Sequence, residues 1–320
     1  MTIREIYEAA VAAGIANDPR GAHGIERVLA ATRKAWEEMP EPRRWEFDEE
    51  SLENPFADTR VLNGDLEQSV TCILAGIDME IGEMLLADRL RERGSGIDLI
   101  LAHHPMGRAL ADLEAVMPVQ ADVWRRFGVP INYGEALMSE RMREIRRAFH
   151  ASNNNEALDA ARLLQLPVMT CHTPADNCVQ SFLQSRCDAL SEDATLEDLL
   201  GMLKEIPEYR EAVRRGTGPI LFQGESERRC GKVMVDMTGG TSGPKESIRR
   251  LADAGVGTIL GMHMGDEHRA LAEEAHVNVV VAGHHASDSL GMNLIMDTFE
   301  RAGVDIIPCS GLIRVSRVPE

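Results

Sequence analysis

Histidines and aspartates gather directly after short apolar runs of this chain. Seven of the ten histidines stand at such positions. They are His103 and His104 in "LILAHHP", His172 in "CHTPAD", His263 and His268 in "HMGDEH", and His284 and His285 in "GHHASD". Carboxylates accompany them at Asp176, Asp266 and Asp288. Neutral imidazole together with carboxylate suits Zn, Mn, Fe, Co or Ni better than Ca or Mg. The pattern therefore predicts a site for divalent transition-metal ions.

The adjacent pair His103 and His104 sets a geometric condition on such a site. A regular strand points neighbouring side chains to opposite faces. Two adjacent ligands therefore require either that the strand has ended or that each histidine serves a different ion. Pro105 favours an extended conformation at His104 and blocks further strand pairing. Taken alone, the pair favours a turn that happens to contain two histidines.

The two carboxylates of the outer motifs stand near predicted helix starts. Asp176 precedes a helix expected over 179–190, and Asp288 falls in the first turn if a helix begins near Ala286. A carboxylate there complements the helix dipole. The alternative is that each aspartate is a helix cap and does not bind metal. A bridging carboxylate is a common way to hold two ions about 3.5–4 Å apart. The three motifs together favour a two-metal site over separate caps.

Alternating elements must position these side chains. Short apolar runs predict strands over 70–77, 99–102, 129–131, 168–171, 220–222, 232–235, 258–260, 277–282 and 304–307. Longer amphipathic runs predict helices over 82–93, 121–127, 135–149, 156–164, 179–190, 195–205, 245–254 and 267–276. Strand–helix alternation is typical of α/β proteins with largely parallel sheets, whose sites lie at the carboxyl ends of strands.

We therefore expect two α/β domains with mixed, largely parallel sheets flanked by helices, plus a helical N-terminal extension. Residues 1–60 form the extension and a linker, and Thr2 and Glu5 supply a capping box for its first helix. Residues 61–190 form the first α/β half, which carries the H-H-P and HTPAD motifs. Residues 191–216 form an acidic helical connection. Residues 217–320 form the second half, which carries GHHASD.

Composition limits the partners. The net charge of −18 argues against binding to nucleic acid or to an anionic membrane surface. No apolar run approaches the roughly 20 residues of a membrane span, and the N-terminus lacks the pattern of a signal peptide. The six cysteines are scattered, which indicates reduced thiols and a cytoplasmic protein. Cys171 and Cys178 flank the candidate site but lack the spacing of zinc ligands.

Three motifs in this order resemble the NGG-interacting-factor-3-like family of dinuclear-metal proteins. They are "AHHP" (102–105), "HTPAD" (172–176) and "GHHASD" (283–288). Some members of that family carry the label GTP cyclohydrolase I type 2. The resemblance covers about Val61 to the C-terminus. It implies two α/β domains with a metal pair in the cleft between them, and ring-shaped hexamers whose sites face an inner cavity.

The resemblance also implies the site residues. By motif position the metal ligands are His103, His104, Asp176, His284 and Asp288. His172 lies close by and either orients a ligand or takes part in proton transfer. The family's last carboxylate is usually glutamate, and Asp288 is one methylene shorter. Residues 1–60 have no counterpart in the short bacterial members.

Other motifs give weaker signals. "MTGGTSGPKES" (237–247) is not a P-loop, because Pro244 separates Gly243 from Lys245, and a structural turn is the favoured interpretation. "HMGDEH" is not the zincin motif, so we expect His263 and Asp266 to line the cleft. Arg108 either meets a substrate phosphate or pairs with a surface acid.

These observations predict a metal-dependent hydrolase with two divalent transition-metal ions per chain. The expected substrate is small, with a nucleotide-like molecule as one option, and the expected nucleophile is a metal-activated water. His172, or an unligated histidine such as His285, would carry the proton. The alternative is a non-catalytic metal-binding scaffold or regulator. In both cases we expect a homo-oligomer.

Overall fold

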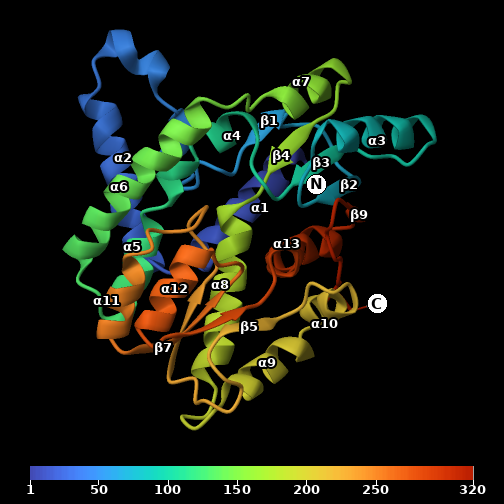
Figure 1. Ribbon diagram of the computed structural model, residues 1–320. Coiled ribbons are helices and arrows are strands. Elements are labelled where there is room, and N and C mark those ends of the chain that lie inside the picture. Colours follow the sequence, from blue (N-terminus) through green and yellow to red (C-terminus); the bar gives the residue numbers. More distant parts are fainter. Residues whose placement is uncertain (320) are drawn as a thin grey trace.

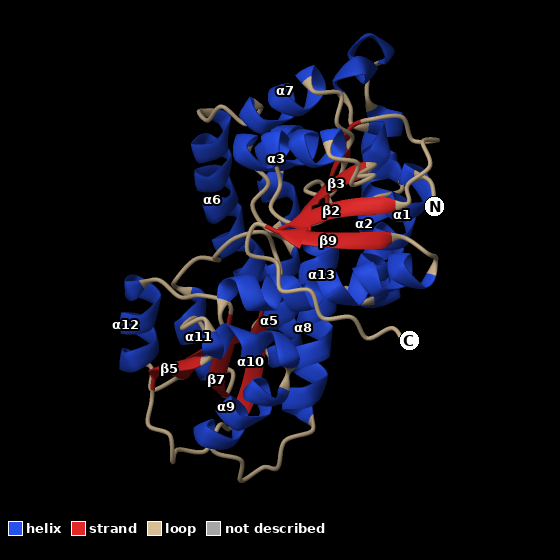
Figure 2. Ribbon diagram, turned by 90° about the vertical axis from the view of Figure 1, so that its right-hand side faces the viewer, coloured by secondary structure: helices blue, strands red, loops and turns tan. Residues whose placement is uncertain are grey.

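Two separate β-sheets carry the three motifs, and helices flank both (Figures 1 and 2). The computed structural model describes residues 1–319. The first sheet has the strand order β1-β4-β3-β2-β9 and the second has the order β5-β8-β7-β6. The first is built from β1 (Val61–Asn63), β2 (Cys72–Gly76), β3 (Leu99–Ala102), β4 (Val168–Thr170) and β9 (Asp305–Cys309). The second is built from β5 (Ile220–Gln223), β6 (Lys232–Asp236), β7 (Val256–Gly261) and β8 (Asn278–Val281).

The helices of the first half begin with α1, whose predicted capping box between Thr2 and Glu5 is present. They are α1 (Ile3–Ala16), α2 (Gly21–Glu38), α3 (Ile81–Glu92), α4 (Gly107–Ala111), α5 (Val119–Phe127), α6 (Ile131–His150), α7 (Glu156–Leu163) and α8 (Thr173–Asp188). Three short 3-10 helices are η1 (Glu41–Glu46), η2 (Glu49–Leu52) and η3 (Leu113–Val116). The remaining helices are α9 (Leu196–Glu205), α10 (Pro207–Arg214), α11 (Ser247–Asp253), α12 (Asp266–Glu274) and α13 (His284–Arg301). Within residues 1–319, none of these helices has the length and apolar character needed to cross a bilayer.

Most strand pairs in both sheets are parallel. In the first sheet β3 pairs in parallel with β2 and β4, and β2 pairs in parallel with β9. In the second, β7 pairs in parallel with β6 and β8. The edge strands β1 and β5 are antiparallel to their neighbours. The predicted fold class, mixed and largely parallel α/β sheets with N-terminal helices, is confirmed.

Helices α8 and α13 connect the two sheets. Helix α8 follows β4 of the first sheet and packs on β6 of the second, while α13 follows β8 of the second sheet and packs on β9 of the first. The two helices also pack on each other, and Figure 1 shows them between the two sheets. They approach closely at Gly291, where a Cβ atom would collide with the carbonyl oxygen of Ala175. This crossing brings the first turns of α8 and α13 together.

Two local predictions are wrong. A strand is predicted over 129–131, but Val129 and Pro130 join α5 to α6, and Val129 packs in a core between helices. Gly128 ends α5 with a φ of 111°, so the chain turns instead of extending. Residues 305–309 are assigned to the second half, yet β9 pairs with β2 in the first sheet. A short apolar strand does not show which sheet it joins.

The segment before β1 is also not an exposed linker. Phe56, Asp58, Thr59 and Arg60 have exposed fractions of 0–1%. The Arg60 guanidinium donates to the carbonyls of Phe56 and Thr59 and pairs with Asp48. Paired polar groups can be buried, and composition alone does not show that their partners exist. We call residues 54–60 the strap.

Candidate metal centre

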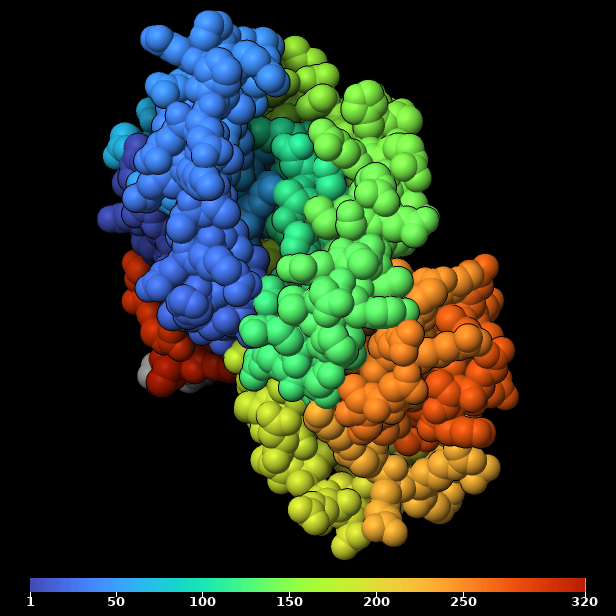
Figure 3. Space-filling view, turned by 90° about the vertical axis from the view of Figure 1, so that its left-hand side faces the viewer, coloured from blue at the N-terminus to red at the C-terminus, as the bar shows by residue number. Residues whose placement is uncertain are grey.

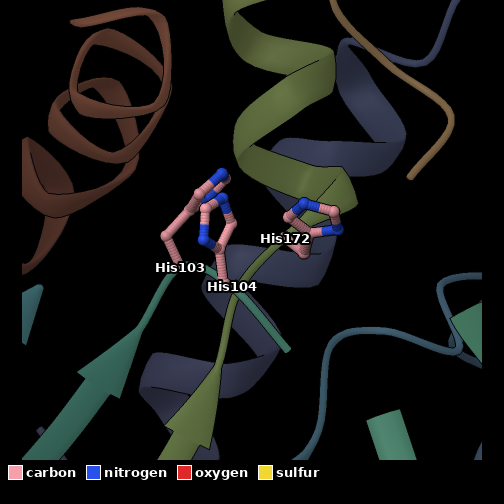
Figure 4. Close-up of side chains that lie close together, drawn as sticks. All are labelled: His103, His104 and His172. Carbon is pink, nitrogen blue, oxygen red and sulfur yellow. The ribbon is translucent and has the colours of Figure 1, made fainter. Parts of the chain in front are cut away.

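The predicted residues meet where β3, β4 and β8 end. His103 and His104 follow β3, and Figure 4 shows them facing His172, which follows β4. His172 caps α8, so Asp176 lies in the first turn of that helix. His284 begins α13, two residues earlier than expected, and Asp288 lies one turn along. Every side chain therefore comes from a strand end or from the helix that follows it.

Three overlapping groups of these side chains could each hold a metal ion. Within each group the nitrogen or oxygen atoms lie within 4.8 Å of one another. The groups are His103, His104 and His172; His104, His284 and Asp288; and His103, Asp176 and Asp288. Together they contain all five residues that the resemblance implies as ligands, and also His172.

Asp288 lies between histidines of both sheets. Its Oδ1 is 3.5 Å from His103 Nε2, and its Oδ2 is 3.8 Å from His104 Nε2 and 3.7 Å from His284 Nε2. Asp176 Oδ1 is 3.6 Å from His103 Nε2. Two ligands with bonds of about 2.1 Å to one tetrahedral ion lie roughly 3.4 Å apart. The spacing is therefore too long for hydrogen bonds and suits ligands that share a cation.

Unpartnered buried atoms support the same interpretation. Among the described residues, four buried atoms of this cluster have no hydrogen-bond partner: His103 Nε2, Asp176 Oδ1 and both carboxylate oxygens of Asp288. Leaving a buried charge uncompensated costs about 3–5 kcal/mol. These atoms fit a bound cation, which would complete their coordination.

Three histidines present the same nitrogen to the cluster because outer acceptors bind the other one. Nδ1 of His103 donates to the carbonyl of Cys171 (3.1 Å) and Nδ1 of His104 donates to Asp78 (2.6 Å). Nδ1 of His172 donates to Asp58 (2.9 Å). Carbonyl and ionised carboxylate oxygens only accept, so Nδ1 carries the proton and Nε2 keeps its lone pair. Metal-binding histidines show this arrangement.

Asp58 is a functional candidate that sequence reasoning missed. Its side chain is completely buried and also accepts hydrogen bonds from the hydroxyl and the backbone N–H of Thr173. Burial alone would raise its pKa, but the bonds from His172 and Thr173 outweigh burial and lower the pKa. The pairing spans 114 residues, and no local pattern marks it. Asp78, in contrast, follows an apolar strand, and that signal is visible in the sequence.

Burial and repulsion from neighbouring histidines keep His104 and His284 neutral. Burial, with repulsion from His103 and His172, lowers the pKa of His104 to about 4. Burial also lowers the pKa of His284. Neutral imidazole is the form that binds metal. At neutral pH these side chains are therefore ready to act as ligands.

The pKa values of the two central carboxylates are shifted in opposite directions. Burial would raise the pKa of Asp288, but His103, His284 and His104 outweigh it and lower the pKa to about 2. Burial and the nearby Asp288 and Asp58 raise the pKa of Asp176 well above its ordinary value, against the opposing effect of His103. The cluster thus already holds one ionised carboxylate, and a second would need a nearby positive charge.

A cavity of about 80 Å³ adjoins the cluster. Its walls include His172, Asp176, His284 and Asp288 on one side, and the loop 238–243 with His263 on the other. The His263 ring centroid is 5.0 Å from that of His284, so His263 lies in the cleft as expected. Of the described residues that line the cavity, none is lysine or arginine. The cavity is therefore polar without fixed positive charge.

The remaining candidates lie elsewhere or serve structure. Asp266 is exposed at the start of α12 and is not among the residues that line the cavity. Arg108 pairs with Glu50 and Asp48, which matches the surface-acid alternative. Cys171 and Cys178 are buried thiols, and burial raises the pKa of both.

The glycine-rich segment at 237–247 is a turn held by Gln120. The side-chain amide of Gln120 donates to the carbonyls of Gly239 and Thr241. Gly239 has a φ of 107°, a conformation that favours glycine. The carbonyl of Gly243 binds Nε2 of His268 (3.0 Å). These contacts fit the structural interpretation of the segment.

Comparison with known proteins supports the fold. Neither family models nor curated protein sequences match the chain. A NIF3 superfamily protein from Sphaerobacter thermophilus has a similar structure, with a TM-score of 0.72 and 24% identity over 90% of this chain and 98% of that one. Reduced HcgD from Methanocaldococcus jannaschii is more distant, with a TM-score of 0.49 and 15% identity over 78% of this chain and 87% of that one. A Bacillus cereus protein related to NIF3 has a TM-score of 0.42 and 11% identity over 93% of this chain and 98% of that one. The likeness to the Sphaerobacter protein confirms the resemblance that the three motifs indicate: this chain has the fold of a NIF3 superfamily protein.

Proposed function

We propose that this chain is a metal-dependent hydrolase whose cluster of buried histidines and aspartates binds two divalent transition-metal ions. The observation that carries the proposal is the set of unpartnered buried atoms on His103, Asp176 and Asp288. They lie at the carboxyl ends of parallel strands, where α/β proteins place their ligands. The cavity beside them gives a substrate a place to bind.

The geometry favours two positions that share one carboxylate. His103 and Asp176 with Oδ1 of Asp288 would hold one ion. His104 and His284 with Oδ2 of Asp288 would hold the other. Asp288 offers a different oxygen to each group, so its shorter side chain still meets the requirement for a bridge.

Divalent transition-metal ions supply Lewis-acid polarisation of a substrate and water activation near neutral pH. The chain's own contribution is proton transfer and access. His172 keeps a free lone pair on Nε2, 3.8 Å from Asp176 Oδ2, while Asp58 accepts its Nδ1–H. A carboxylate in that position stabilises the imidazolium form, so His172 can accept a proton and return it to a leaving group.

The accessible side of the cluster indicates how a substrate enters. The His104 and His284 side chains are 27% and 41% exposed, whereas those of His103 and Asp288 are almost completely buried. A substrate therefore meets the His104 and His284 side first. Without lysine or arginine in the cavity wall, an anionic group would depend on the bound cations for its charge partner. The substrate class that fits is a small molecule with a hydrolysable carbonyl, amidine or phosphoryl group.

Elemental analysis and a hydrolysis screen test the proposal together. The purified chain, saturated in turn with Zn, Mn, Fe, Co and Ni and then desalted, should hold about two ions of the preferred metal. It should hydrolyse at least one class of ester, amide, cyclic amidine or phosphoester in a panel. Absence of bound metal from every preparation would overturn the metal centre. Two bound ions without any turnover would instead favour a metal-binding scaffold.

A further inference from the structure

We propose that Asp58 is a positioning residue for the metal centre. Its carboxylate holds His172 in the one tautomer and ring orientation that turns a lone pair toward the cluster. The inference rests on the proposed function and extends it to a segment outside the three motifs. Asp58 itself does not contact the cavity or the other five side chains of the cluster.

The hydrogen bonds of Asp58 determine where the His172 proton lies. Oδ2 of Asp58 accepts from Nδ1 of His172 at 2.9 Å and from the Thr173 hydroxyl at 2.6 Å. The backbone N–H of Thr173 lies 3.3 Å from the same oxygen. An ionised carboxylate only accepts, so the proton must be on Nδ1. Nε2 is left unprotonated and faces Asp176.

The strap holds Asp58 in one place. The Thr170 hydroxyl donates to the carbonyl of Asp58 at 3.0 Å, and the backbone N–H of Arg60 donates to that hydroxyl at 3.1 Å. The hydroxyl of Thr59 accepts the backbone N–H of His172 at 3.1 Å. The strap is therefore bonded to both sides of the turn between β4 and α8. Because the Asp58 carboxylate is held in one position, it can hold the His172 ring in one orientation.

Arg60 secures the strap from its outer side. Its guanidinium is buried, pairs with Asp48 and Glu50, and donates to the carbonyl of Phe56. The Asn54 side chain bonds the Tyr7 hydroxyl and the carbonyl of Thr59, which ties the strap to α1. The extension before β1 thus reaches the metal centre through a continuous series of buried hydrogen bonds.

A simple helix cap is the competing explanation, because Asp58 also accepts hydrogen bonds from Thr173 at the start of α8. The two roles depend on different bonds. A cap requires the Thr173 contacts, whereas positioning requires the bond to Nδ1 of His172. Thr173→Ala removes a capping contact and leaves the bond to His172. Asp58→Ala removes the acceptor of the Nδ1 proton, so the ring proton is free to move to Nε2.

The first experiment reads the tautomer directly in the metal-free full chain. Long-range ¹H–¹⁵N correlation of histidine-labelled protein distinguishes the two neutral tautomers, and His172→Gln assigns the signal by its loss. We expect wild type and Thr173→Ala to show His172 protonated on Nδ1, and Asp58→Ala to show protonation shifted toward Nε2. A wild-type His172 protonated on Nε2 overturns the inference, even if the Asp58 variant does not fold.

The second experiment measures metal affinity by Co²⁺ titration and visible absorption. His172 also belongs to one of the three groups that could hold an ion, so Asp58→Ala should weaken binding by about 10- to 100-fold and change the absorption bands, as changes to the outer partners of metal-binding histidines do. Asp98→Ala is the matched control, because Asp98 also accepts hydrogen bonds from the hydroxyl and backbone N–H of a threonine, Thr71, and precedes β3 at the end opposite to His103. Equal losses of Co²⁺ affinity in both variants would show that Asp58 has only a structural role. If wild type binds no Co²⁺, the proposed metal centre is wrong. The tautomer of His172 then still tests whether Asp58 positions its ring.

Discussion

Nε2 of His103 lies 3.5 Å from Oδ1 of Asp288, although the two residues follow strands of different sheets. His103 ends β3 of the first sheet, and Asp288 lies one turn into the helix that follows β8 of the second. Neither atom has a hydrogen-bond partner within the described chain. The proposed metal centre therefore depends on how the two sheets are placed relative to each other.

Asp288 and Asp176 should differ in their effect on metal content. Asp288 belongs to two of the candidate groups and Asp176 to one. We expect Asp288→Asn to lower the content from about two ions per chain to well below one, and Asp176→Asn to remove about one. Equilibrium dialysis followed by elemental analysis measures both. Asp266→Asn, at an exposed carboxylate, should keep wild-type content, and equal losses in the Asp288 and Asp176 variants would contradict a shared carboxylate.

Removal of metal should destabilise the chain. A ligand at 100 times its Kd adds about 2.7 kcal/mol to the free energy of unfolding. For a chain of this size, each ion bound in this way raises the Tm by about 4 °C relative to the chelator-treated form. Differential scanning calorimetry of both forms measures the shift. The double variant His103→Ala with His104→Ala should fold and show no shift, and a metal-dependent shift in that variant would mean that the ions bind elsewhere.

Gly291 should be required for the crossing of α8 and α13. A Cβ atom there would collide with the carbonyl of Ala175, next to Asp176. We expect Gly291→Ala to lower the free energy of unfolding by about 2 kcal/mol or more and to weaken metal binding, because backbone must shift. Urea unfolding and Co²⁺ titration measure the two effects.

A matched control exists in α9. Within residues 1–319, nothing lies within 4 Å of a Cβ placed on Gly201. Gly201→Ala should therefore stabilise the chain by about 0.5–1 kcal/mol through helix propensity. If Gly291→Ala behaves like Gly201→Ala, the helix crossing tolerates a methyl group and the predicted clash is wrong.

Stability should fall at alkaline pH. Burial, with a smaller contribution from Asp188, raises the pKa of Cys187 from 9.0 to about 12. Burial likewise raises the pKa of Cys309 to about 11. At a pH between the ordinary thiol pKa of 9.0 and these raised values, the two thiols have lost their protons in the unfolded chain but keep them in the folded chain. The contribution to stability is therefore complete below pH 9 and is lost as the pH rises through 11–12.

Urea unfolding under reducing conditions at pH 7.5, 9 and 10.5 measures this decline. Cys187→Ala removes one raised thiol and should make the decline shallower, while its effect at pH 7.5 should be modest because the side chains are similar in size. An unchanged slope in the variant would show that Cys187 does not contribute to the pH dependence.

The sequence was sufficient to locate the candidate cluster for a physical reason. His103 and His172 follow neighbouring strands of the first sheet, His284 follows a strand of the second, and the carboxyl ends of parallel strands meet at one edge of each sheet. Local patterns therefore place chemistry-bearing residues at the carboxyl edge of each sheet. The fold class follows from the same alternation of strands and helices.

Local sequence patterns could not predict contacts between distant segments. Asp58 meets His172 only because the strap crosses the turn before α8, and the strap resembles an ordinary polar linker in composition. The return of β9 to the first sheet likewise depends on the path of α13. The apolar run at 129–131 satisfies a helix–helix core as well as it would a strand. Gly128 and Pro130 turn the chain between α5 and α6, so this run does not form a strand.

The position of β9 has a consequence for the order of events during synthesis. The first sheet has β9 as an edge strand beside β2, and this strand is formed by residues 305–309. A ribosome still holding those residues carries a chain whose first sheet is incomplete and whose α13 is not yet docked on it. We therefore expect the contact between His103 and Asp288, and with it any uptake of metal, to follow the emergence of residues 305–309 from the ribosome.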